Sequence, residues 1–269
     1  VPVALGAVTT VHLQQLLQIQ PSGSRDLGRL ALVAGAALGF LTVAIPLQLE
    51  HQWITIGWAL EGAAVAWLYK RIPHRGLLWS AVGLLGVVFV RLALNPEVFR
   101  YEPRGDRRIV NWYLYTYVIA AAAMGLAAWW LSKTDDVITA RLPRIRHVLP
   151  AGAAILLFLL LNIEIADYYS DGPEILFRFG ASIQQDLTYT IAWLIFGIIM
   201  LAAGIAGKAR AARMASVAMI AVTTFKAFLY DLGSLEGLYR VGAFVGLASS
   251  LALVSLALQK YVLAKEPAR

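Results

Sequence analysis

The sequence predicts an all-α fold: a polytopic membrane helix bundle of about eight transmembrane helices. The 269 residues are 59% hydrophobic and only 14% charged, whereas a soluble domain carries roughly 25% charged residues. Apolar runs close to the length of a bilayer span, about 20 residues, recur along the whole chain. Basic residues also gather on alternate sides of these runs, as expected for a multi-pass protein.

The spans follow one another with little room for a separate soluble domain. Residues 1–26 resemble the end of an upstream segment and suggest a fragment or processed product, the alternative being an ordinary amphipathic N-terminal helix. Because proline cannot continue a helical hydrogen-bond pattern, it marks several span edges, including Pro46, Pro73 and Pro150. The predicted spans are 29–46, 53–69, 77–94, 112–131, 148–163, 187–206, 213–230 and 240–261.

The loops between the spans indicate how the chain is oriented. One side holds the segment up to and including Arg29, the loops 70–76, 132–147 and 207–213, and the C-terminus from Lys260, which includes the tail 263–269, with 15 basic and 4 acidic residues. The other side has 6 basic and 11 acidic residues. Because excess Lys and Arg marks cytoplasmic loops, both ends and the linker 132–147 are predicted to be cytoplasmic. In the opposite-side loop 164–186, Asp171 can cap a short helix with Pro173 in its first turn.

A weak internal repeat accompanies this pattern. A shift of 135 residues without a gap aligns Thr55, Trp58 and Gly62 with Thr190, Trp193 and Gly197, and it aligns Arg91 with Lys226. Two four-span halves, 27–131 and 148–262, would then be parallel repeats, because four spans return the chain to its starting side. Parallel repeats occur in transporters, although gene duplication without a transport role fits the pattern equally well.

Ionisable residues within or beside the spans are the candidate binding residues. Glu61 lies near the middle of the second span, where an unpaired charge costs several kcal/mol, so it needs neutralisation, a partner or water. The other candidates gather toward the outer ends of the spans: Arg91, Lys226, Asp231, Arg240, Glu164, Asp167 and Asp186. Arg91 and Lys226, at equivalent points of the two repeats, can grip a carboxylate or phosphate. The structural alternative is that the cations snorkel to the interface and that Glu61 pairs with Arg91 or Lys226.

Several chemistries have no support in the sequence. There is no cysteine and the four histidines are scattered, so no metal site or thiol chemistry is predicted. Motifs for nucleotide phosphates, dinucleotides and serine nucleophiles are missing, and no cofactor is expected. A catalytic role stays uncertain, since only dispersed carboxylates such as Asp167, Asp186 and Asp231 could act as bases.

Two stretches carry a resemblance to a known family. They are AIPLQLEHQWITIGWALEGAAVAWLY and a C-terminal segment that contains FKAFLYDLGSLEGLYRVGAF. The chain resembles, over most of residues 27–262, bacterial multi-span membrane proteins catalogued as domain of unknown function 2339. Lys226, Asp231, Leu235, Tyr239 and Arg240 match the recurring pattern of that family. The resemblance implies a bacterial inner membrane and further spans upstream, and it supplies no catalytic residues.

Three functions fit these observations. The first is a transporter or small-molecule or anion-binding membrane module whose site opens to the periplasmic side. The second is a structural or assembly component of the cell envelope. The third is a membrane enzyme acting on a lipid-linked or periplasmic substrate. The expected partners are the lipid bilayer, upstream spans of a longer chain and a small anionic or lipid-linked ligand. Nucleic acid is not expected, because the excess positive charge lies in the predicted cytoplasmic loops.

Overall fold

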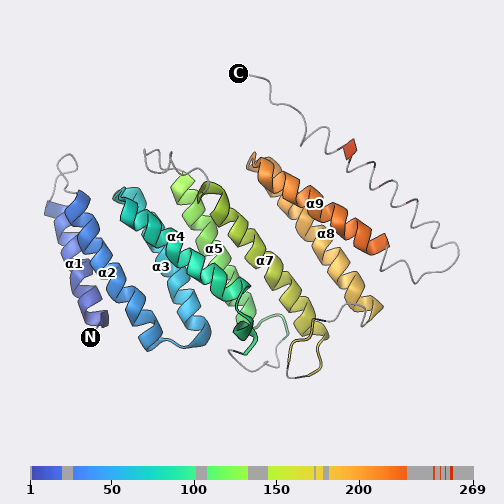
Figure 1. The fold of residues 1–269 in the computed structure, drawn as a ribbon, viewed down its shortest axis with the longest axis horizontal. Coiled ribbons are helices and arrows are strands. Elements are labelled where there is room, and N and C mark those ends of the chain that lie inside the picture. The colour runs from blue at the N-terminus through green and yellow to red at the C-terminus, as the bar shows by residue number, and fades with distance from the viewer. Residues whose placement is uncertain are drawn as a thin grey trace, which may run out of the picture. The chain divides into compact units, whose positions relative to one another are not determined.

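The computed structural model is all-helical wherever it describes the chain, which confirms the predicted fold class. It describes residues 2–19, 27–100, 108–132, 145–172, 174–177 and 182–228, with a few isolated positions beyond. No strand occurs among these residues. The helices (Figure 1) are α1 (Pro2–Ile19), α2 (Leu27–Gln48), α3 (His51–Arg71), α4 (Arg75–Ala93), α5 (Trp112–Ser132), α7 (Ile145–Tyr169), α8 (Ile183–Ala206) and α9 (Arg210–Lys226), with a 3₁₀ turn, η1 (Pro96–Arg100).

The chain divides into two compact units. The first comprises residues 1–164 and 172–175, and the second comprises residues 165–171 and 176–269. The division falls inside α7, after Glu164, so that the last turn of this helix belongs to the second unit.

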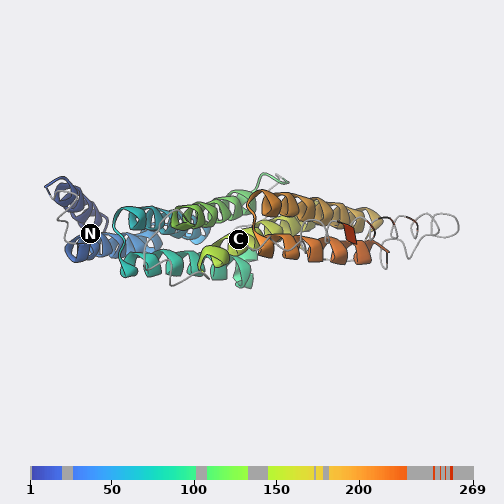
Figure 2. The same cartoon turned by 90° about the horizontal axis from the view of Figure 1, so that it is seen from above.

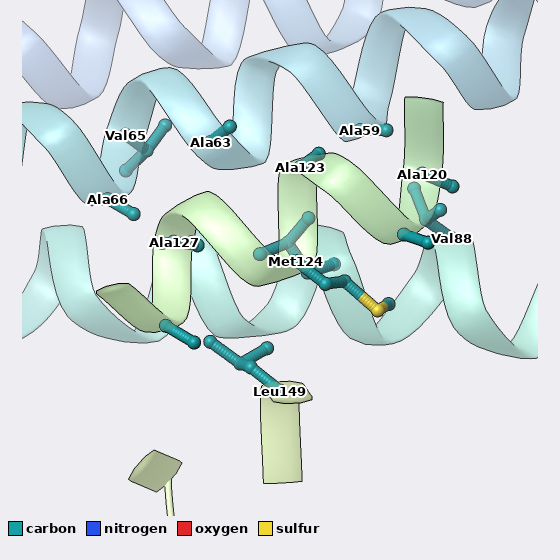
Figure 3. Close-up of a cluster of buried hydrophobic side chains, with 14 of the residues drawn as sticks. Ala59, Ala63, Val65, Ala66, Val88, Ala120, Ala123, Met124, Ala127 and Leu149 are labelled. Atoms are coloured by element: carbon teal, nitrogen blue, oxygen red, sulfur yellow. The ribbon is translucent and has the colours of Figure 1, made fainter. Parts of the chain in front are cut away.

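The core of the first unit lies where α3 packs against both α4 and α5. Small side chains allow this close approach: Ala59 and Ala63 of α3 are almost fully buried, as are Ala120 and Ala123 of α5. Figure 3 shows Met124 of α5 among side chains from the neighbouring helices, including Leu149 of α7. A flexible Met side chain adapts well to the irregular spaces of such a core.

Local sequence explains where the α3–α4 hairpin turns. Pro73 disfavours the helical conformation of the residue before it, and Ile72 accordingly leaves the helix with φ −131° and ψ 87°. The next helix begins at once, because the His74 imidazole accepts a hydrogen bond from the main-chain N–H of Gly76 at 3.2 Å. The two helices are therefore antiparallel neighbours joined by a short turn.

The second unit contains a similar hairpin, made of α8 and α9. Ser182 caps α8 by accepting a hydrogen bond from the Gln185 N–H at 3.2 Å. The turn follows Ala206, and Gly204 allows α9 to approach closely, since an added Cβ would lie 3.0 Å from the main-chain nitrogen of Arg213. The two helices run alongside each other (Figures 1 and 2).

The number of spans is not confirmed as eight. Five of the described helices are long and apolar enough to cross a membrane: α2, α4, α5, α7 and α8. α3 is long enough but carries Glu61 and polar ends. α9 has 17 residues, slightly fewer than a perpendicular span needs. The predicted eighth span, 240–261, lies almost entirely outside the described residues.

The short helix predicted after Asp171 is wrong for the residues that are described there. Residues 170–172 and 174–177 are not helical. The Ser170 hydroxyl instead donates to the Ala166 carbonyl at 2.7 Å and accepts from the Leu176 N–H at 3.0 Å. This side chain therefore organises a turn after α7, and a buried serine outweighs the capping signal of Asp171.

Candidate functional site

Arg91 and Lys226 each donate hydrogen bonds to a neighbouring helix, and each of these two places is called a cation site here. The first cation site consists of Arg91, Thr55 and the carbonyl of His51. Arg91 lies in the last turn of α4, where a positive charge interacts favourably with the helix dipole. Its Nε donates to Thr55 Oγ1 at 2.9 Å and its Nη2 donates to the His51 carbonyl at 3.2 Å. Thr55 is fully buried. The guanidinium therefore joins the last turn of α4 to the first turns of α3. This end of the hairpin, away from the connecting turn, is called its open end.

The second cation site consists of Lys226, Thr190 and the carbonyl of Asp186. Lys226 closes α9, and its Nζ donates to Thr190 Oγ1 at 2.7 Å and to the Asp186 carbonyl at 3.1 Å. The Thr190 hydroxyl donates to the same carbonyl at 3.0 Å. The ammonium thus joins the last turn of α9 to the first turns of α8. The main-chain oxygen of Asp186 is therefore one acceptor for this cation.

Glu61 lies in the interior of the first unit, with only 3% of its surface exposed. Its Oε1 is 2.6 Å from the hydroxyl oxygen of Thr42 on α2. The hydrogen-bond partner is therefore Thr42 and not Arg91, one of the two cations that the sequence offers as partners. Six residues separate Glu61 from Thr55, a rise of about 9 Å along α3, so Arg91 reaches Thr55 while Glu61 meets a different helix.

Thr42 makes a second contact with the same face of α3. Pro46 lies inside α2 and has no N–H, so the carbonyl four residues earlier, that of Thr42, loses its usual helical donor. The indole N–H of Trp58 donates to this carbonyl at 3.3 Å. Trp58 and Glu61 are three residues apart and share one helix face. Thr42 is therefore bound through both its main-chain and side-chain oxygens.

The remaining candidate residues are dispersed. Glu164 accepts a hydrogen bond from Asn111 Nδ2 at 3.2 Å in the first unit. Asp167 belongs to the second unit and is 3% exposed. Asp186 is in the first turn of α8, where a negative charge interacts favourably with the helix dipole. Asp231 and Arg240 lie outside the described residues.

Sequence reasoning missed the roles of Thr42, Thr55, Thr190 and Asn111. A signal for the first was present, because Pro46 stands four residues after Thr42 and therefore frees its carbonyl. A signal for Thr55 and Thr190 was present too, since both fall on matching positions of the predicted repeat. Nothing local identified Asn111, because its contact with Glu164 joins residues far apart in the chain.

Comparison with known proteins gives the family. No curated protein and no solved structure matches this chain significantly. The model of one protein family, described as predicted membrane protein (domain of unknown function 2339, DUF2339), matches residues 2–174 and residues 76–261. These two matches overlap and together cover nearly the whole chain, and the helices long and apolar enough to cross a membrane agree with the family description. The chain belongs to the DUF2339 family of predicted membrane proteins.

Proposed function

We propose that this chain is a membrane module that binds a small anionic ligand at its two cation sites, as a transporter or binding protein would. The main support is that the two hairpins, α3–α4 and α8–α9, use residues 135 positions apart for the same contacts. Thr55 corresponds to Thr190 and Arg91 to Lys226. His51, whose carbonyl accepts from Arg91, corresponds to Asp186, whose carbonyl accepts from Lys226.

Packing inside each hairpin supports the same correspondence. A Cβ added to Gly62 would lie 2.8 Å from Cγ of Leu85. A Cβ added to Gly197 would lie 2.8 Å from Cγ1 of Ile220, the residue 135 positions after Leu85. The helix boundaries also correspond, since α3 and α8 end, and α4 and α9 begin, at matching positions. Two copies of one ancestral unit account for these agreements, and they extend the repeat that the sequence predicts.

The chemistry of the cation sites favours an anion as ligand. The threonine hydroxyl and the main-chain carbonyl that accept from each cation are neutral groups, so these two hydrogen bonds orient the cation and do not themselves cancel its charge. Arg and Lys held in this way recognise carboxylates and phosphates through charge-assisted hydrogen bonds. The charge distribution of the loops supports a periplasmic position for the open ends of both hairpins.

A structural role is the second candidate. Each cation bridges the two helices of its own hairpin. This contact by itself holds the two helices together at the open end. A component that stabilises or assembles the envelope needs no more than that. The two candidates differ in whether an added anion changes the stability of the protein.

Thermal unfolding of the detergent-purified chain with inorganic phosphate and with succinate tests the proposal. A ligand at 100 times its dissociation constant adds about 2.7 kcal/mol to the free energy of unfolding. We expect one of these anions to raise the Tm of the wild type, with the shift lost in Arg91→Gln and Lys226→Gln.

Arg75→Gln and Arg210→Gln are the matched controls. These exposed residues also correspond in the two hairpins, but they begin α4 and α9 and so lie at the opposite ends of the helices. They should leave the shift unchanged. A wild type that neither anion stabilises, combined with a low Tm of Arg91→Gln and Lys226→Gln, would support the structural role instead.

A further inference from the structure

The hydroxyl of Thr42 lies within hydrogen-bond distance of two acceptors. Its Oγ1 is 2.8 Å from the Leu38 carbonyl and 2.6 Å from Glu61 Oε1. A threonine hydroxyl has one hydrogen to donate and can also accept. Both contacts are hydrogen bonds at the same time only if the carboxyl group of Glu61 carries a proton and donates it to Thr42, while Thr42 donates to Leu38.

The competing arrangement is an ionised Glu61 that accepts from Thr42. The Leu38 carbonyl would tolerate this, because it is part of a regular helix. The carboxylate would not be well compensated: Glu61 is 3% exposed, and its Oε2 has no hydrogen-bond partner among the described residues. The free energy of burying a carboxylate that has one neutral hydrogen bond is much less favourable than that of burying a protonated acid with one unpaired carbonyl oxygen.

The surroundings of α3 do not supply a compensating charge through a direct bond. The helices packed against it are α2, α4 and α5. Their ionisable residues in the described structure are Arg29 of α2, Arg75 and Arg91 of α4, and Tyr113, Tyr115 and Tyr117 of α5. None of these hydrogen-bonds the Glu61 carboxyl group in the part of the chain that is described. Arg91 donates instead to Thr55 and to the carbonyl of His51.

We propose that Glu61 and Thr42 form a proton-binding site, with Glu61 protonated at neutral pH. Release of the proton to water leaves a carboxylate, and the Thr42 hydroxyl then rotates to donate to it instead of to Leu38. The exchange therefore breaks one hydrogen bond and reverses another, without moving either helix. The proton-binding site does not depend on the anion-binding proposal, which rests on contacts that the two hairpins share. Glu61 has no counterpart in the second hairpin, because the residue 135 positions later is Phe196.

Pro46 makes the contact between α2 and α3 sensitive to whether Glu61 is protonated. The helix α2 lacks one main-chain hydrogen bond at Thr42, and Trp58 of α3 replaces it. Thr42 is thus held to α3 through Trp58 and Glu61, at a point where its own helix is weakened. A change in the charge of Glu61 acts directly on the contact between α2 and α3.

Infrared spectroscopy of the full chain in lipid vesicles tests the proposal. A buried, protonated carboxyl group gives a C=O stretching band that shifts in D₂O. We expect this band at neutral pH in the wild type and in Glu97→Gln, which changes an exposed carboxylate of η1, and we expect its loss in Glu61→Gln. Absence of the band in the wild type at neutral pH overturns the proposal.

Two further measurements keep the test decisive if Glu61→Gln fails to fold. Thr42→Val removes the acceptor at nearly constant shape, so the acid band should move to higher frequency, whereas Thr42→Ser should leave it in place. A band that is unchanged in Thr42→Val refutes the role of Thr42. Replacing choline chloride by sodium chloride should not alter the band, and its disappearance on adding sodium would identify a sodium site instead.

Discussion

Threonine hydroxyls are partners of ionisable residues on neighbouring helices in the described structure. Thr55 and Thr190 accept from Arg91 and Lys226, and Thr42 meets Glu61. A hydroxyl is well suited to this task because it both donates and accepts and adds no charge to an apolar environment. Each of these three ionisable side chains therefore has a neutral partner on an adjacent helix, and the polar contacts connect helices as well as stabilise ionisable groups.

We expect Thr55→Val to lower the Tm of the purified chain. Valine keeps the shape but leaves a guanidinium N–H of Arg91 without its buried acceptor, and hydrogen bonds to charged groups contribute about 1.5–3 kcal/mol. Combining Thr55→Val with Arg91→Gln should cost less than the sum of the two single changes. Thr224→Val is the control, since that hydroxyl donates to the Ile220 carbonyl of its own helix. Strictly additive losses would mean that the bond contributes nothing.

At the scale of the helices, a glycine of the first helix lies against a large side chain of the second helix in each hairpin. Gly62 lies against Leu85 of α4, and Gly197 lies against Ile220 of α9. Small residues permit such contacts in membrane proteins, where dispersion and shape replace the hydrophobic effect as the reason for helices to associate. Because the two contacts correspond in the proposed repeat, they should respond alike to substitution.

Gly62→Ala and Gly197→Ala should each destabilise the protein by about 1–3 kcal/mol, the usual cost of overpacking. The new Cβ would lie 2.8 Å from a branch-point or inner side-chain carbon that cannot simply move aside. Gly86→Ala is the matched control on α4, because nothing lies within 4 Å of its added Cβ. There alanine should be neutral or stabilising by up to about 1 kcal/mol, through its higher helix propensity. Thermal unfolding in one detergent measures all three, and a tolerated Gly62→Ala would contradict the packing described here.

At the scale of the whole molecule, the orientation in the membrane follows from charge. Lys and Arg dominate one set of loops, and the positive-inside rule assigns that set to the cytoplasm. The open ends of the two hairpins, with their cation sites, then face the opposite side. This topology is a prediction, and the sequence offers a simple way to test it because it contains no cysteine.

A single cysteine introduced at Glu174 should react with a membrane-impermeant reagent in intact cells. Glu174 is exposed, unlike the neighbouring Ser170, which is 5% exposed and hydrogen-bonded. A cysteine at Lys70, exposed at the end of α3, should react only after lysis. The reverse pattern of labelling would invert the topology and place the cation sites in the cytoplasm.

The sequence by itself determined the class of the protein and most of its helices. A run of about 20 apolar residues must satisfy its main-chain hydrogen bonds internally in a bilayer, so composition alone predicts a helix. Pro73 sets the end of α3 and the His74 cap sets the start of α4, for equally local reasons. The spacing of 135 residues also predicts that Thr55 corresponds to Thr190 and Arg91 to Lys226.

The tertiary structure decided which side chains meet. Glu61 has Thr42 as its partner, and Asn111 reaches Glu164, because helix rotation and depth depend on packing between α2, α3 and the other helices rather than on any local pattern. A rotation of one residue, 100° on a helix with 3.6 residues per turn, would have turned Glu61 away from Thr42. Apolar residues are distributed nearly uniformly around a membrane helix, so their pattern does not fix that rotation. The contact of Trp58 with the carbonyl freed by Pro46, visible only in three dimensions, shows how α2 and α3 are joined.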